Sequence, residues 1–218
     1  MNSIRVGVAD DHPVVLAGIE NLIKNAPGLE IAFLADTMAA MIEAIESQPI
    51  DVLVCDYEFS DEPLTDGLNL LASIRRRFPA LKVLLTSTRT APGIVSAALI
   101  YGATGFIGKV QANPSTLTRA ILAVHAGSIY LSPEFDGNVL SCFLRVIRAF
   151  NAVPVALSDL ELQVVGLICR DVAMPEIARR LNRSPGTIAG RKRAAMKKLA
   201  AGSDAELKSI ARDMGIFR

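Results

Sequence analysis

The chain has 218 residues, of which 51% are hydrophobic, so it is long enough for one or two domains that each bury a core. Its net charge of +1 conceals an asymmetry, because residues 1–132 hold 9 basic and 13 acidic residues and the remainder holds 14 and 9. The three cysteines have no paired spacing, which argues against a disulfide framework and for a reducing compartment.

The chain also lacks the marks of secretion and of a membrane span. Residues 1–11 have no signal-peptide pattern. Residues 90–108 carry no charge, but four glycines and Pro92 interrupt this stretch, so a helix followed by a short strand explains it better than a membrane span. We therefore expect a cytoplasmic protein that does not enter the membrane.

The first half of the chain alternates apolar runs with segments of helical periodicity. The apolar run 4–9 precedes Pro13, which the first turn of a helix tolerates, and Pro27 and Gly28 end that helix. The same alternation recurs at 29–35 with 37–47, 51–56 with 67–78, 82–86 with 92–101, and 104–108 with 114–126. Five alternations predict an α/β fold with a five-stranded, doubly wound parallel sheet in the flavodoxin-like order 2-1-3-4-5.

The second half of the chain predicts a smaller all-α domain. An apolar stretch at 135–150 falls in the connection and predicts a linker helix. Ser158 with Glu161 forms a capping-box pattern that opens the second domain, and Ser203 with Glu206 forms another before the last helix. We therefore divide the chain into a first domain at 1–127, a partly helical linker at 128–155 and a second domain at 156–218.

Polar residues stand at the ends of four predicted strands. Asp10 and Asp11 follow the first strand, Asp56 ends the third, Thr86 ends the fourth, and Lys109 follows the fifth. Because the carboxyl ends of parallel strands share the edge of the sheet where ligands bind, we expect these residues to form one site. Three carboxylates repel one another, and Mg²⁺ relieves that repulsion. Lys109 and Thr86 would contact phosphoryl oxygens, and Asp56 would be the nucleophile that forms an acyl phosphate.

Several motifs resemble those of bacterial two-component response regulators. The segments ADDHPVVLAGI and GATGFIGK, together with Asp56 and the pair Asp66 and Gly67, match the receiver-domain pattern in order over residues 1–130. The second half resembles a LuxR-type helix-turn-helix over LSDLELQVVGLICRDVAMPEIARRLNRSPGTIAGRKRAAMKKL. The whole chain is therefore similar to the NarL/FixJ class and, through LNRSPGTI and AMKKL, to its RcsB-like members.

This resemblance implies a phosphorylation-controlled transcription regulator rather than an enzyme. A sensor histidine kinase or phosphotransfer protein would phosphorylate Asp56, with Mg²⁺ held by the three carboxylates and the backbone carbonyl of Glu58. Phe106 matches the family's switch position, where an aromatic ring rotates inward behind Thr86, although the sequence is equally consistent with a core residue. The chain would then bind promoter DNA as a homodimer or as a heterodimer with an auxiliary regulator.

The helix-turn-helix consists of predicted helices at 175–181 and 185–199, joined by residues 182–184. The second helix should lie in the major groove, with an inward apolar face formed by Ile188, Ala195, Met196 and Leu199. Between Glu176 and Asp204 there are eight basic residues and no acidic one, which is typical of a polyanion partner. We predict DNA contacts at Thr187, Ala189, Gly190, Arg191, Lys192, Arg193, Lys197 and Lys198.

The predicted DNA contacts fall into two kinds. Arg193 is the main candidate for reading a base, because a guanidinium can bind guanine O6 and N7 at the same time. Arg191, Lys192 and Lys198 are expected to lie nearer the flanking phosphates.

Departures from the family pattern keep two other functions open. Residues 57–60 replace the usual Leu-x-Met-Pro, so Glu58 places a carboxylate beside the nucleophile, and Val110 replaces a proline that often follows the lysine. One alternative is a phosphorylation-independent, partner-controlled DNA-binding regulator, although the complete set at the strand ends argues against it. The other is a metal-dependent phosphohydrolase with Glu58 as acid/base, but the helix-turn-helix has no place in such an enzyme.

The remaining reactive residue types are expected to be structural. His12 and His125 lack partners or ligand spacing. The cysteines are expected to be small buried apolar residues at Cys55, Cys142 and Cys169.

Overall fold

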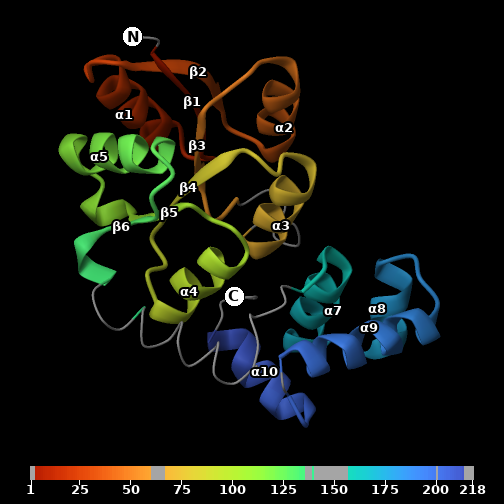
Figure 1. Cartoon of the computed structure of the whole chain (residues 1–218). Coiled ribbons are helices and arrows are strands. Elements are labelled where there is room, and N and C mark those ends of the chain that lie inside the picture. Colours follow the sequence, from red (N-terminus) through yellow and green to blue (C-terminus); the bar gives the residue numbers. More distant parts are fainter. Residues whose placement is uncertain (1–2, 60–66, 136–138, 140–156, 200, 214–218) are drawn as a thin grey trace.

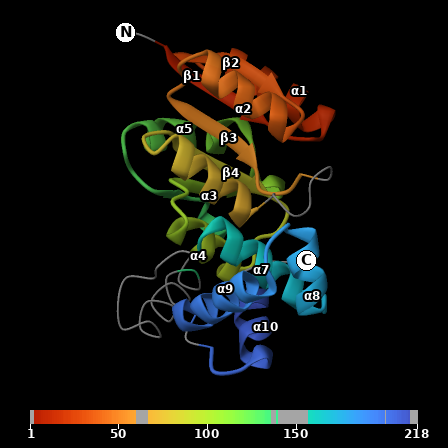
Figure 2. The same ribbon diagram turned by 90° about the vertical axis from the view of Figure 1, so that its right-hand side faces the viewer.

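The computed structural model describes residues 3–59, 67–135, 139, 157–199 and 201–213. An N-terminal α/β domain is followed by a C-terminal helical domain, which lies against one side of it (Figure 1, red to green and blue; Figure 2). The linker predicted at 128–155 and its helix fall largely outside the described residues, as do Asp66 and Cys142. Within the described part of the chain, no helix combines the length and hydropathy needed to cross a membrane.

The sheet contains six parallel strands, in the order β2-β1-β3-β4-β5-β6. Their bounds are β1 Ile4–Ala9, β2 Leu29–Ala35, β3 Val52–Asp56, β4 Lys82–Ser87, β5 Gly105–Gly108 and β6 Tyr130–Leu131. The predicted order of the first five is confirmed. The predicted number is wrong by one, because β6 is only two residues long and carries no periodicity of its own. It extends the sheet through backbone hydrogen bonds from Tyr130 to Thr104 and from Ser132 to Phe106, at 3.1 and 3.2 Å.

Five helices cover the two faces of the sheet. They are α1 Pro13–Lys24, α2 Met38–Ser47, α3 Leu68–Arg77, α4 Pro92–Ile100 and α5 Pro114–His125. α1 and α5 pack against one face through residues such as Ile23 and Ile121, and α2, α3 and α4 pack against the other. Local signals begin these helices: a proline stands in the first turn of α1, α4 and α5, and the side chains of Thr37 and Asn113 cap α2 and α5.

The C-terminal domain has four described helices around a small core. They are α7 Asp159–Cys169, α8 Met174–Arg180, α9 Pro185–Lys198 and α10 Asp204–Asp213. The predicted capping box at Ser158 and Glu161 is confirmed in both directions. Before α10, Ser203 accepts from the backbone of Glu206, whereas the Glu206 carboxylate accepts from Gly202. Residues 181–184 join α8 to α9, and the two helices pack against each other.

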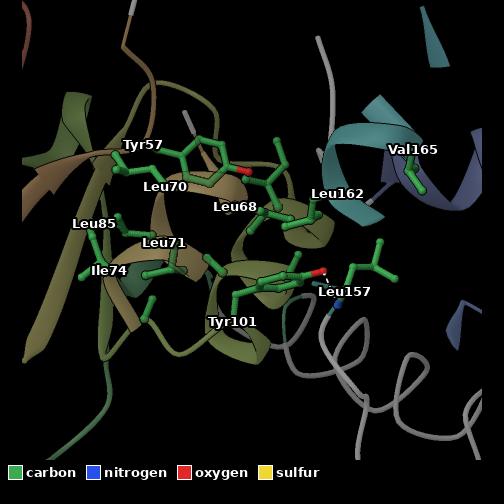
Figure 3. Packing of buried hydrophobic residues seen from close by; sticks show 14 of the residues in the cluster. Tyr57, Leu68, Leu70, Leu71, Ile74, Leu85, Tyr101, Leu157, Leu162 and Val165 are labelled. Carbon is green, nitrogen blue, oxygen red and sulfur yellow. Dashed lines mark hydrogen bonds between the residues drawn. The ribbon is translucent and has the colours of Figure 1, made fainter. Parts of the chain in front are cut away.

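The two domains meet along α3, the end of α4 and α7. Figure 3 shows Leu162 of α7 beside Leu68 of α3, with Tyr101 directly below them. The Tyr101 hydroxyl accepts a hydrogen bond of 2.8 Å from the backbone N–H of Leu157, and Arg76 of α3 forms an ion pair with Asp159. The C-terminal helical domain is therefore docked through α7, and much of α9 is exposed.

Candidate functional site

The site lies at the carboxyl edge of the sheet, where the fold brings together residues from four strands. Asp10 and Asp11 follow β1, Asp56 is the last residue of β3, and Lys109 follows β5. Thr86 on β4 is the register partner of Asp56. Parallel strands place their carboxyl ends side by side, so the predicted grouping follows directly from the strand order.

The Lys109 ammonium group joins two of the carboxylates. Lys109 Nζ lies 2.8 Å from Asp10 Oδ2 and 2.7 Å from Asp56 Oδ2. The Lys109 side chain is only 15% exposed, and both carboxylates are more deeply buried. Charge-assisted hydrogen bonds of this length in a partly dehydrated site hold all three groups in fixed positions.

Burial and charge shift the protonation equilibria in opposite directions. Burial raises the pKa of Asp56 from 3.8 to about 6, against the lowering effect of the Lys109 hydrogen bond, and the nearby Asp10 charge adds to the rise. Burial alone would lower the pKa of Lys109, but its hydrogen bonds to Asp10 and Asp56 outweigh this and raise it. Near neutral pH, Asp56 is therefore mainly ionised and Lys109 remains a cation.

The acidic residues fit a divalent cation. Asp10, Asp11, His12 and Asp56 each present one ligand atom, and these atoms lie within 4.8 Å of one another. Three carboxylates face one ammonium group, so negative charge remains in excess. Oxygen donors of this kind suit Mg²⁺.

The prediction that His12 lacks partners is wrong. Its Nδ1 lies 2.7 Å from Asp11 Oδ1 and 3.2 Å from Asp10 Oδ1, although the side chain is 62% exposed. The sequence DDHP held the signal, because a residue directly after two site carboxylates lies within reach of both.

Thr86 and Phe106 lie behind the carboxylates. Thr86 is buried, and its hydroxyl donates a long hydrogen bond of 3.5 Å to the backbone carbonyl of Cys55. Phe106 is fully buried and packs edge-on against Phe135, with ring centroids 5.6 Å apart, and at a tilt against Tyr57 at 6.3 Å. The ring thus points inward and belongs to the core in this structure. Phe135, in the predicted linker, was not expected at this position.

Two aromatic side chains follow Asp56 within the described residues, in the segment where the family pattern ends in a proline. Tyr57 and Phe59 are both buried, and the Tyr57 carbonyl accepts from the backbone of Gly67 at 2.8 Å. Gly67 has φ +60°, which favours glycine, and a Cβ there would lie 3.2 Å from the Tyr57 ring. Glu58 lies 3.6 Å from Arg89, which sequence reasoning missed although it stands only three residues after Thr86.

Helix α9, which the sequence predicts to be the recognition helix, presents its basic face to solvent. Its predicted inward face is confirmed, with Ile188, Ala195 and Leu199 buried and Met196 half-buried. Among the predicted DNA contacts, the exposed ones are Thr187, Gly190, Arg191, Arg193 and Lys197, and the half-buried ones are Ala189, Lys192 and Lys198.

Two of these lysines already have acidic partners within the domain. Lys198 Nζ lies 2.6 Å from Oε2 of the buried Glu161, and Lys192 Nζ lies 2.6 Å from Asp204 Oδ2. Burial favours protonated Glu161, but the hydrogen bonds from Lys198 and Ser158 prevail and lower its pKa. Lys198 therefore joins α9 to α7, a role that the charge pattern alone did not indicate.

Comparison with known proteins agrees with this geometry. A family model for the response regulator receiver domain matches residues 6–122. The transcriptional regulatory protein RcsB of Escherichia coli (strain K12) is 31% identical over 207 residues, which cover 95% of this chain and 93% of RcsB. UhpA of the same strain, also a transcriptional regulatory protein, is 27% identical over 204 residues, or 94% and 95% of the two chains.

Solved structures give the same result for the full length. A structure of two RcsB dimers bound to two parallel DNAs matches with a TM-score of 0.60 and 29% identity, covering 97% of this chain and 99% of the other. RcsB from Salmonella enterica serovar Typhimurium, bound to the promoter rprA in the presence of the phosphomimetic BeF₃⁻, matches with a TM-score of 0.60 and 30% identity, covering 96% and 98%.

Proposed function

Since the chain belongs to the NarL/FixJ class of response regulators, we propose that it accepts a phosphoryl group on Asp56 and, in that form, binds promoter DNA as a dimer. The observation that carries the proposal is the contact of Lys109 with both Asp10 and Asp56 at the sheet edge, in a chain that also has an exposed basic helix. The relatives RcsB and UhpA are transcriptional regulators, which supports a regulatory role over an enzymatic one.

The side chains support phosphoryl transfer as follows. Asp56, mainly ionised near neutral pH, attacks the phosphorus of a phosphohistidine on a sensor kinase or phosphotransfer protein, so that an O–P bond forms as the N–P bond breaks. Lys109, already fixed on the Asp56 carboxylate, neutralises a phosphoryl oxygen, and the Thr86 hydroxyl turns from Cys55 toward another. Mg²⁺ held by the three carboxylates and the Glu58 carbonyl would neutralise further phosphoryl charge.

The exposure and the positive charge of α9 support its role in binding DNA. Arg193 and Lys197 stand on the solvent face of α9, opposite the buried Ile188 and Ala195. A helix of this kind enters the major groove, and two copies in a dimer read two half-sites. The second helix comes from a homodimer or from a heterodimer with an auxiliary regulator. The protein acts in the cytoplasm and does not contact the membrane.

The test measures mass and DNA binding on the same samples. Wild type incubated with acetyl phosphate and Mg²⁺ should gain the mass of one phosphoryl group, form dimers and bind promoter DNA more tightly, and Asp56→Asn should do none of these. Asp36→Asn is the matched control, because Asp36 also follows a strand but is exposed. If wild type bound DNA equally well with and without acetyl phosphate, the phosphorylation-independent regulator would replace this proposal.

A further inference from the structure

His12 is the N-cap residue of α1, but its side chain does not cap the helix. Its backbone carbonyl accepts the first helical hydrogen bonds, from Val15 and Leu16, whereas its side chain makes no capping bond. The following Pro13 restricts His12 to an extended backbone, and its φ of −104° and ψ of 109° agree with this. The backbone N–H of His12 also donates to Asp10 Oδ1 at 3.0 Å, which fixes the ring beside the carboxylates.

The distances around the ring match the spacing of ligands around one cation. Cations bound by nitrogen and oxygen lie about 2.0 to 2.2 Å from each ligand, so neighbouring ligands are about 3 Å apart. His12 Nδ1 lies 2.7 Å from Asp11 Oδ1 and 3.2 Å from Asp10 Oδ1, on either side of that spacing. The high exposure of His12 leaves the ring open to the solvent from which a cation arrives.

We propose that His12 Nδ1 is a further ligand of the divalent cation at this site, and that its imidazole raises the affinity of the site for Co²⁺ relative to Mg²⁺. The inference uses the same carboxylates as the proposed function and rests on it for the site, but not for the role of His12. Carboxylates and water suit Mg²⁺ and Mn²⁺, whereas imidazole suits later metals, so one imidazole shifts preference along the series from Mn²⁺ to Co²⁺.

The sequence offers an unusually clean test, because it contains only two histidines, His12 and His125. In the tag-free full chain loaded with Mn²⁺, pulsed electron paramagnetic resonance should detect ¹⁴N coupling from one directly bound imidazole. His12→Asn should abolish the coupling, and His125→Ala should keep it. Asparagine is a favoured residue at a helix N-cap, so His12→Asn removes the imidazole without weakening the start of α1.

Titrations with MgCl₂ and CoCl₂ give a second readout. The ratio of Co²⁺ to Mg²⁺ affinity should fall by about tenfold or more in His12→Asn, in line with the loss of a metal-site partner, and stay the same in His125→Ala. No ¹⁴N coupling in wild type, or an unchanged affinity ratio in His12→Asn, would overturn the inference.

The two proposals fail separately. Phosphorylation of wild type in Mg²⁺ without any imidazole coupling in Mn²⁺ would remove only the role of His12. Imidazole coupling in a wild type that takes no phosphoryl group would remove only the proposed function.

Discussion

The strand-end site and the recognition helix differ in how their charged side chains are compensated. At the strand ends, Lys109 lies between two buried carboxylates, and the positions of these groups are fixed before any ligand arrives. On α9, Arg191, Arg193 and Lys197 project into solvent, and under the proposed function DNA completes their arrangement. Changing a charge that is paired inside the fold alters stability, whereas changing an exposed charge alters mainly binding. Mutations in the two regions should therefore show up in different measurements.

The largest stability effect should come from Lys109→Met. Removing the ammonium group leaves the buried carboxylates of Asp10 and Asp56 facing each other, and breaking a buried ion pair costs about 3 kcal/mol. Urea unfolding without divalent cations would measure the loss, and added Mg²⁺ should recover part of it. Lys24→Met is the control, because its ion pair with Glu20 is exposed and contributes less than about 1 kcal/mol. Equal losses in both variants would contradict the comparison.

Asp56→Asn should raise the free energy of unfolding, whereas Lys109→Met lowers it, and the size of the gain should depend on pH. The folded pKa of Asp56, about 6, exceeds its ordinary value of 3.8, so the folded state retains a proton that the unfolded state has lost. Wild type therefore loses stability as pH rises from 3.8 to 6, and asparagine avoids this loss. One pKa unit corresponds to about 1.4 kcal/mol, so after allowance for the weaker Lys109 contact we expect a gain of about 2 kcal/mol at pH 8.

The measurement is urea unfolding without divalent cations at pH 5 and pH 8. The gain from Asp56→Asn should shrink clearly at pH 5, where the folded Asp56 is mainly protonated. Asp36→Asn, at an exposed strand end, should show no such dependence. A gain of the same size at both pH values would mean that burial of the charge is not its cause.

The smallest expected effect comes from substitutions on the exposed face of α9. They should change DNA affinity and leave the free energy of unfolding unchanged. Arg193→Ala should weaken binding to the preferred operator by roughly 1 to 2 kcal/mol and have little effect on random DNA. Arg191→Ala, the matched control, should weaken both and flatten the salt dependence by about one unit of slope. Titrations on operator and scrambled duplexes at several salt concentrations decide this, and equal losses on both duplexes would make Arg193 a phosphate contact.

Lys198 is a poor probe of phosphate contacts, because it belongs to both kinds of region. Its bond to the buried Glu161 means that Lys198→Ala would change the stability of the domain as well as its charge. A loss of DNA affinity in that variant could therefore not be assigned to a missing phosphate contact.

The contrast also explains what the sequence could predict. Asp10, Asp56, Thr86 and Lys109 were found because each ends an apolar run, and strand order alone brings such ends together. β6 was missed because a strand of two residues is too short to show an alternation of apolar and polar side chains. Arg89 and Phe135 were missed because their partners lie far away in the chain, and only packed coordinates reveal such pairs.

The charge pattern predicted only part of what the structure shows for α9. The basic run indicated an exposed basic face, which the structure has, but it could not show that Lys192 and Lys198 contact Asp204 and Glu161. The sequence could not decide the role of Phe106 either, because a switch residue and a core residue have the same apolar side chain. The structure shows its inward, packed position.

The docking of Tyr101 against Leu157 has a consequence for assembly. A partner that needs this end of α4 can bind only molecules in which the DNA-binding domain has moved away, because Leu157 and α7 already cover it. Its apparent dissociation constant is then the intrinsic value divided by the undocked fraction. If about one molecule in ten were undocked, the partner would bind about tenfold more weakly than to the receiver surface alone. Tyr101→Phe, which removes the hydrogen-bond acceptor for Leu157, should narrow that gap by increasing the undocked population.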